Sequence, residues 1–155
     1  MLSLIDINKA INDKIKAALV GTDFESVKIV AEDVSKPIIR PSIKVDLEQS
    51  ENGKFNASCR EKTLTIRVYF FASDANKYKI ENLKFQDIIE TALLDGLYVN
   101  DAHVPVDDIT SDVADTVLII SFDLYLLELM PEDTTNPIGE PLELMEELNY
   151  KEEIK

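Results

Sequence analysis

The chain has 155 residues, enough for one domain with a substantial core, and its composition is that of a globular protein, 45% hydrophobic and 30% charged. Sixteen Lys and Arg face thirty Asp and Glu, which gives a formal net charge of −14 at pH 7. Because such a surface repels phosphates and anionic lipids, the charge disfavours a DNA-binding or membrane-surface role.

Cysteine and histidine usage excludes further classes of protein. Cys59 is the single cysteine and His103 the single histidine, so no internal disulfide framework is possible, and a zinc site would need carboxylates or a second subunit. The N-terminus lacks the pattern of a signal peptide, and no stretch approaches 18 apolar residues. We therefore expect a soluble cytosolic protein.

The first segment predicts a helix that begins after Ser3, a plausible N-cap with Asp6 three residues on, and ends at Gly21. The short apolar run 27–31 predicts a strand. The apolar residues at helical spacing are Leu4, Ile7, Ile11, Ile15, Ala18 and Leu19.

A long β-hairpin is expected next, because apolar and polar residues alternate over 43–47 and again over 64–70. Asn52-Gly53 lies between the two runs, and Asn-Gly is typical of a two-residue hairpin turn. A turn there places Lys44 opposite Glu61, a favourable charge pair.

The apolar residues of this hairpin lie at its base, so its polar tip is expected to project beyond the core. The tip could contact a neighbouring molecule or remain an exposed loop. The tip residues that we single out as candidate interaction residues are Glu48, Glu51, Asn52, Lys54, Phe55 and Arg60.

A second helix is expected between a cap at Ser73 or Asp74 and a stop at Gly96, with an apolar stripe of Leu83, Ile88, Ala92 and Ile80. Two short extended pieces follow, over 98–106 and 109–112. The strand 116–129 is the longest and is apolar on both sides. This pattern favours a central strand that helices or a neighbouring subunit cover on each face.

The composition changes at Pro131, which divides the chain into a domain over 1–130 and an acidic C-terminal extension over 131–155. Residues 142–150 are a candidate amphipathic helix. Its apolar face could dock on a sheath or neck protein, or the extension could be disordered in the isolated protein. That face consists of Leu142, Leu144, Met145 and Leu148.

The sequence offers no set of residues for catalysis. An acid-rich stretch lacks the spacing of a calcium loop, His103 and Cys59 have no partner in sequence, and there is no phosphate-binding loop or nucleophile elbow. We therefore expect no enzyme activity, no metal site and no cofactor. The acid-rich stretch contains Asp101, Asp107, Asp108, Asp112 and Asp115.

These elements together predict an α/β (α+β) fold. It would contain a mixed, mainly antiparallel sheet with a long projecting hairpin, two main flanking helices and an acidic C-terminal arm. In its order of elements the chain resembles the tail terminator proteins of contractile-tailed phages and of phage-tail-like particles of Gram-positive bacteria. The resemblance covers about residues 1–130, and its carrying segments are LSLIDINKAINDKIKAAL, DVSKPIIRPSIKVDLE, LTIRVYFFASDANKYKIENL and LIISFDLYLLE.

The resemblance implies a structural protein that forms a hexameric ring on the head-proximal end of the tail tube, ends polymerisation of tube and sheath, and joins the tail to the neck or head. Its implied partners are further copies of itself and the tube, sheath and neck or head-completion proteins, while DNA passes through the lumen without specific binding. The protein would occupy the host cytoplasm during assembly and then the virion or tail-like particle. Two alternatives stay open: another tail-completion, head–tail connector or tube-like subunit, or a small cytosolic ligand-binding domain or enzyme.

Overall fold

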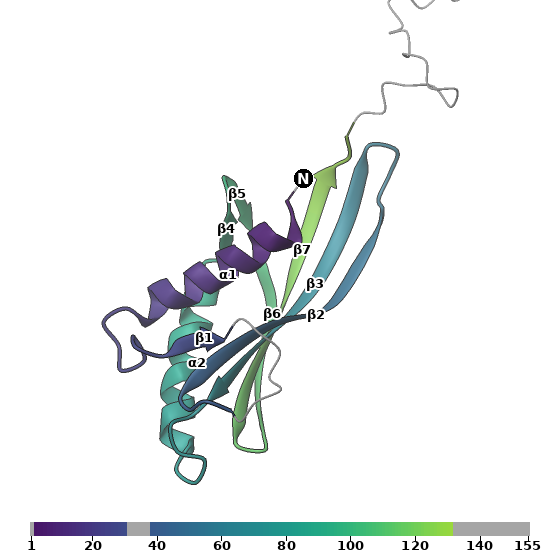
Figure 1. Ribbon diagram of the computed structural model, residues 1–155. Helices are drawn as coiled ribbons and strands as arrows, with labels where there is room; N and C mark the ends of the chain where they lie inside the picture. The colour runs from purple at the N-terminus through teal and green to yellow at the C-terminus, as the bar shows by residue number, and fades with distance from the viewer. Residues whose placement is uncertain (1, 31–37, 132–155) are drawn as a thin grey trace, which may run out of the picture.

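A five-stranded sheet organises the part of the chain that the structure describes, residues 2–30 and 38–131 of a computed structural model (Figure 1). The strand order is β1-β2-β3-β7-β6; β1 and β2 are parallel and all other neighbours antiparallel. The short strands β4 and β5 pair separately. The elements are α1 (Leu4–Leu19), β1 (Lys28–Val30), β2 (Ser42–Lys54), β3 (Cys59–Phe71), α2 (Lys79–Leu93), β4 (Leu97–Val99), β5 (Ala102–Val104), β6 (Val106–Ala114) and β7 (Val117–Leu129).

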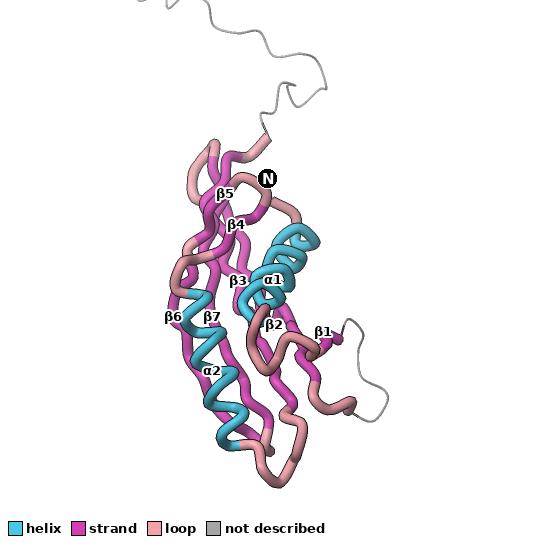
Figure 2. The backbone as a smooth tube through the Cα atoms, turned by 90° about the vertical axis from the view of Figure 1, so that its left-hand side faces the viewer, coloured by secondary structure: helices cyan, strands magenta, loops and turns pink. Residues whose placement is uncertain are grey.

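Both helices cover the same face of the sheet, and the core lies between them and that face (Figures 1 and 2). Phe70 of β3 stacks on Phe85 of α2 with ring centroids 4.2 Å apart, and Phe24 meets both rings edge-on. The mainly antiparallel α+β fold expected from the sequence is therefore confirmed.

Helix α1 forms as the sequence predicts. The Ser3 hydroxyl oxygen accepts a hydrogen bond from the Asp6 backbone N–H at 3.1 Å, which satisfies one of the free donors of the first turn. Gly21, at φ +76°, follows the helix in the left-handed region that glycine tolerates. Of the expected apolar stripe, Leu4 is 44% exposed and lies outside the core.

Helix α2 presents a different face from the predicted one. It begins at Lys79, with no side-chain cap, and buries Phe85, Ile89 and Leu93. Two residues of the predicted stripe, Ile80 and Leu83, are 65% and 52% exposed. The aromatic contacts of Phe85 account for this rotation, because burying a phenylalanine removes more apolar surface from water than burying a leucine at the end of the helix.

The hairpin of β2 and β3 exists, but the predicted turn is wrong. Asn52 and Gly53 lie inside β2, and the turn spans residues 55–58. There the Asn56 side-chain oxygen accepts hydrogen bonds from the backbone N–H groups of Ser58 and Cys59, both at 2.8 Å. Asparagine favours turns through this type of contact, so Asn56, and not Asn52, is the residue that stabilises the hairpin turn.

Burial explains why the Asn52-Gly53 turn does not form. It would have placed Ile43, Val45 and Leu47 opposite Lys62, Arg60 and Ser58, and Lys44 opposite Glu61. The observed register pairs the three apolar residues with Phe70, Val68 and Ile66, and Lys44 with Tyr69. Buried cross-strand pairs therefore outweigh a local turn preference.

Strand β7 lies between β3 and β6, as its apolar pattern predicts. Its even-numbered residues from Leu118 to Leu126 are buried under the helices. No described element covers the opposite face, where Tyr125, Leu127 and Leu129 are 42%, 51% and 74% exposed. The expected cover on that second face is therefore not supplied by residues 2–30 or 38–131.

Candidate interaction surfaces

The hairpin tip projects past the helices, and it holds the first group of candidate residues (Figure 1). Phe55 lies in the turn and is 57% exposed. Lys54 is exposed at the end of β2 and pairs in register with Arg60. Asn52 pairs with Lys62 two positions lower. Exposed aromatic side chains such as Phe55 are enriched in protein interfaces.

Two predicted residues of the hairpin make contacts within the chain. Glu48 lies at the irregularity between Leu47 and Gln49, where β2 carries one extra residue. Its carboxylate accepts a hydrogen bond from the Tyr69 hydroxyl at 2.5 Å. Burial and this carboxylate raise the pKa of Tyr69 above its usual value of 10.0. Glu51 accepts a hydrogen bond from the Gln49 amide at 3.2 Å.

Arg60 belongs to a partly buried cluster rather than to a free surface. Its guanidinium donates two hydrogen bonds to Glu128 Oε2, at 3.0 and 2.8 Å, and the backbone N–H of Leu2 donates to Glu128 Oε1 at 2.7 Å. The two charged side chains are 20% and 11% exposed. Burial alone would raise the pKa of Glu128, but the Leu2 N–H and the Arg60 guanidinium lower it below its usual value. This cluster ties the start of α1, the hairpin and β7 together.

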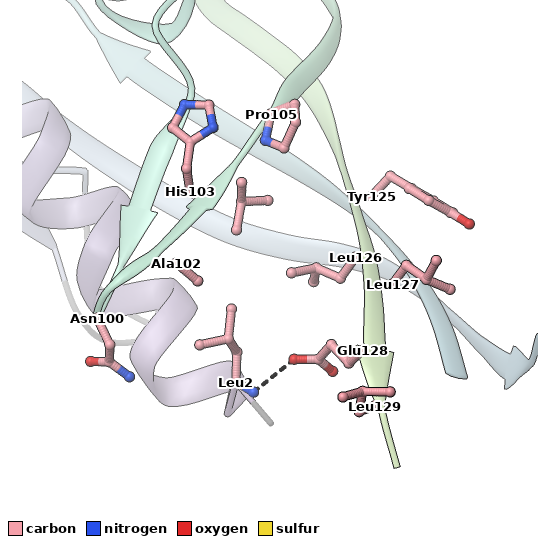
Figure 3. Close-up of a pocket in the computed structure, with 11 residues that line it drawn as sticks. Leu2, Asn100, Ala102, His103, Pro105, Tyr125, Leu126, Leu127, Glu128 and Leu129 are labelled. Atoms are coloured by element: carbon pink, nitrogen blue, oxygen red, sulfur yellow. Dashed lines mark hydrogen bonds between the residues drawn. The ribbon is translucent and has the colours of Figure 1, made fainter. Parts of the chain in front are cut away.

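A groove of about 700 Å³ lies beside this cluster, between the N-terminal end of α1, the β4–β5 hairpin and the end of β7 (Figure 3). Leu2, Val104 and Pro105 line the groove, and Leu126 and Glu128 of β7 face Leu2 across it (Figure 3). The groove is open and mainly apolar, with no convergent set of acids and bases that would indicate a catalytic pocket.

The end of β7 also has a free backbone edge. Strand β6 pairs with β7 only up to Leu124, whereas β3 pairs with it up to Leu129. Because Met130 N–H donates to Ser58 on the β3 side, the alternation of an antiparallel ladder directs the backbone groups of Tyr125, Leu127 and Leu129 outward. On this outer edge, away from β3, no residue of the described segments pairs with these three, and such an edge can accept another strand.

His103 has a structural role in the described fold. Its Nε2 lies 2.8 Å from the Asp95 carbonyl oxygen and donates to it, and its ring meets Tyr98 edge-on at 4.9 Å. Gly96, at φ +77°, passes so close that an added Cβ would lie 2.7 Å from His103 Nε2 and 2.8 Å from the Val104 oxygen. These contacts fasten the β4–β5 hairpin to the end of α2.

The remaining sequence candidates do not form a chemical site. Cys59 is a free, half-buried thiol paired in register with Leu129. Within residues 2–30 and 38–131, no group of three or more His, Cys, Asp or Glu side chains is arranged to hold a metal ion. Nor is any helix of those segments long and apolar enough to cross a membrane. The residues of the acid-rich stretch are spread from the β4–β5 turn to the β6–β7 turn. Two of them have positive φ: Asp108, at the register irregularity within β6, and Asp115, between β6 and β7.

The sequence patterns did not predict the Glu128 cluster or the groove. An acid within the apolar run of 124–129 was a usable signal, because a carboxylate in a buried strand needs a partner. The C-terminal extension lies outside the described residues apart from Pro131. So do its four candidates, Leu142, Leu144, Met145 and Leu148.

A comparison with protein families gives a match over most of the chain. A family model described as phage tail terminator protein matches residues 6–136, which is more than four fifths of the chain. No curated protein matches the chain. The match begins inside α1 and runs past the end of β7, so it includes every described strand.

Proposed function

Since this chain belongs to the phage tail terminator family, we propose that it forms a hexameric ring that caps the head-proximal end of the tail tube. In this role the ring ends polymerisation of the tube and sheath and provides the surface to which the neck or head attaches. The family indicates a structural component of the phage tail. The family match is the single observation that carries this proposal.

The hairpin end of the sheet supports a closed ring in physical terms. A ring of identical subunits needs two different contact surfaces on opposite sides of each subunit. At the hairpin end, the described strands that lie side by side are β2, β3 and β7. The outer edge of β2 is unpaired by described residues beyond Lys44, and that of β7 beyond Leu124. Two free edges on opposite sides are suited to head-to-tail contact between copies.

The open face of the sheet and the tip supply surface for the other partners. Tyr125, Leu127, Leu129 and Phe55 are exposed apolar residues at this end. We assign the tip to contact with the tail tube, and the sheath and neck proteins to the remaining ring surfaces. Six copies of a chain with a net charge of −14 would repel DNA in the lumen, so the genome would pass without specific binding.

The assembly experiment measures the mass of the full-length protein by light scattering, alone and with purified tail tubes, and images the mixtures by negative stain. We expect a mass of six subunits and density at one end of each tube. Growth into filaments of unlimited length would favour the alternative of a tube-like or connector subunit. A monomer that leaves tube length unchanged would refute the ring.

A pair of variants tests the tip. Phe55→Ser removes the exposed ring of the turn and is expected to weaken capping while the fold stays intact. Ile80→Ser is the matched control, because Ile80 is similarly exposed at 65% but lies on α2, away from the tip. Equal capping of tail tubes by the two variants would show that the Phe55 ring does not contribute to the contact with the tube.

Location follows from the same proposal. A tail component is part of the virion, and we propose that this chain assembles in the host cytoplasm before it is incorporated into a virion or a phage-tail-like particle.

A further inference from the structure

The helix-side face of the hairpin carries an excess of positive charge in a strongly acidic protein. In the ladder Lys54 pairs with Arg60, Asn52 with Lys62, and Arg60 with Glu128, so these side chains share one face. Glu128 is engaged by Arg60. That leaves the two lysines with no acidic partner among residues 2–30 and 38–131.

Lys62 is unusual because it is 8% exposed. Buried lysines are rare unless they are paired, since removing an ammonium from water is unfavourable. No hydrogen bond or ion pair connects Lys62 to another residue of the described segments. Its neighbours in register are Asn52 and Leu126, neither of which supplies a negative charge.

A pocket of about 450 Å³ lies on this part of the hairpin, and the last two described residues contribute to its lining. Lys54 and Arg60 line the pocket from the hairpin, and Met130 and Pro131 line it from the end of β7. The Met130 N–H donates to the Ser58 carbonyl at 2.8 Å, which fixes the chain beside the tip as it leaves the sheet.

The 24 residues that follow have the complementary character. They contain eight acids and two lysines, and residues 142–148 combine apolar side chains with Glu143, Glu146 and Glu147. Ten residues, 132–141, connect that stretch to the pocket and can span up to about 33 Å, so it can return to the hairpin from which the chain departs. A short connection also gives a high effective concentration, about millimolar.

We propose that residues 142–148 dock on the hairpin of the same chain, with their carboxylates against Lys54 and Lys62 and their apolar side chains over Met130 and Pro131. The occupant of the pocket is thus an acidic segment of the molecule itself. The contact covers the helix-side face of the hairpin and leaves the free edges of β2 and β7 accessible, so it does not depend on ring formation.

Zero-length carbodiimide cross-linking of the full-length protein tests the proposal, because it joins a lysine to a carboxylate only where the two touch. An equal mixture of ¹⁴N- and ¹⁵N-labelled chains is treated at a concentration where light scattering gives a monomer, and the cross-linked peptides are identified by mass. We expect Lys54 or Lys62 joined to Glu143, Glu146 or Glu147, always within one isotope. Lys9, exposed on α1, is the control lysine and should form no such link.

Two results would overturn the proposal. Links of mixed isotope would show that a second copy fills the pocket, and an absence of any link at Lys54 and Lys62 would show that residues 142–148 do not reach them. A second measurement uses the variant Glu143→Gln/Glu146→Gln/Glu147→Gln. Its hairpin amides over 50–54 should exchange with solvent faster than in the unmodified chain, and unchanged exchange would contradict docking.

Discussion

Replacing Glu128 by Gln measures how strongly the end of β7 holds the start of α1 and the hairpin. The change preserves shape but removes the charge that accepts hydrogen bonds from Leu2 and from Arg60. Hydrogen bonds to charged groups each contribute about 1.5–3 kcal/mol. The burial of both charges opposes this gain, and one acceptor oxygen remains, so we expect the free energy of unfolding to fall by about 2–3 kcal/mol.

Urea denaturation of the full chain, followed by circular dichroism, gives this free energy. With a denaturant slope of about 2 kcal/mol/M, the midpoint should fall by about 1–1.5 M and the slope should not change. Asp23→Asn is the control, because it removes an exposed ion pair with Lys84. The Lys84 Nζ atom lies 3.8 Å from Asp23 Oδ2, and the Asp23 and Lys84 side chains are 83% and 59% exposed. That pair should contribute less than about 0.5 kcal/mol. Equal midpoints for Glu128→Gln and Asp23→Asn would refute the reasoning.

The pH dependence of the stability of the unmodified chain and of Glu128→Gln gives an independent check on the role of the Glu128 charge. The pKa of Glu128 is lower in the folded chain than its usual value of 4.5. Its contribution is therefore complete above that value and is lost as the pH falls through the folded pKa. The stability difference between the unmodified chain and Glu128→Gln should be constant from pH 7 to about 5 and narrow below about pH 4.5. A difference that stays constant down to pH 3 would contradict this account.

Three further variants test other parts of the structure. Gly96→Ala should lower the free energy of unfolding by more than about 1 kcal/mol, because the position has φ +77° and its Cβ would meet an imidazole nitrogen at 2.7 Å; an unchanged thermal midpoint would contradict this. Gly53→Thr should leave the thermal midpoint unchanged, since nothing lies within 4 Å of the added Cβ. Asn56→Ala should lower the thermal midpoint, because it removes the turn contacts at a cost of about 1 kcal/mol. A larger loss of stability for Gly53→Thr than for Asn56→Ala would favour the Asn52-Gly53 turn instead. Leu127→Lys should leave the chain folded but abolish the proposed ring in light scattering, while Ile80→Lys should keep it; a ring that survives Leu127→Lys would exclude this edge.

The sequence predicts those elements whose apolar pattern is long and whose ends carry local signals. Helix α1 has both, with Ser3 at its start and Gly21 after its end. Strand β7 is apolar on both faces over most of its length, which is typical of a strand inside a sheet. For these elements the local preference and the tertiary contacts agree.

Prediction fails where a distant contact decides between two local possibilities. Leu83 and Phe85 are close in sequence, and the packing of Phe85 against Phe24 and Phe70 places Phe85 in the core while Leu83 is exposed. Asn52 and Asn56 are both reasonable turn residues, and the pairing of apolar residues at the hairpin base selects Asn56. The same limit applies to the Glu128 cluster, whose members lie 126 and 68 residues apart in the chain.

The place of β7 in the sheet has a consequence for synthesis of the chain. It is the last of the described strands to leave the ribosome, yet it pairs with both β3 and β6 in the interior of the sheet. Until it emerges, the growing chain holds two strands with unsatisfied edges and an incomplete core. The nascent chain therefore cannot present a finished subunit before residue 129 is free, so a prematurely terminated product lacks the surfaces on which assembly depends.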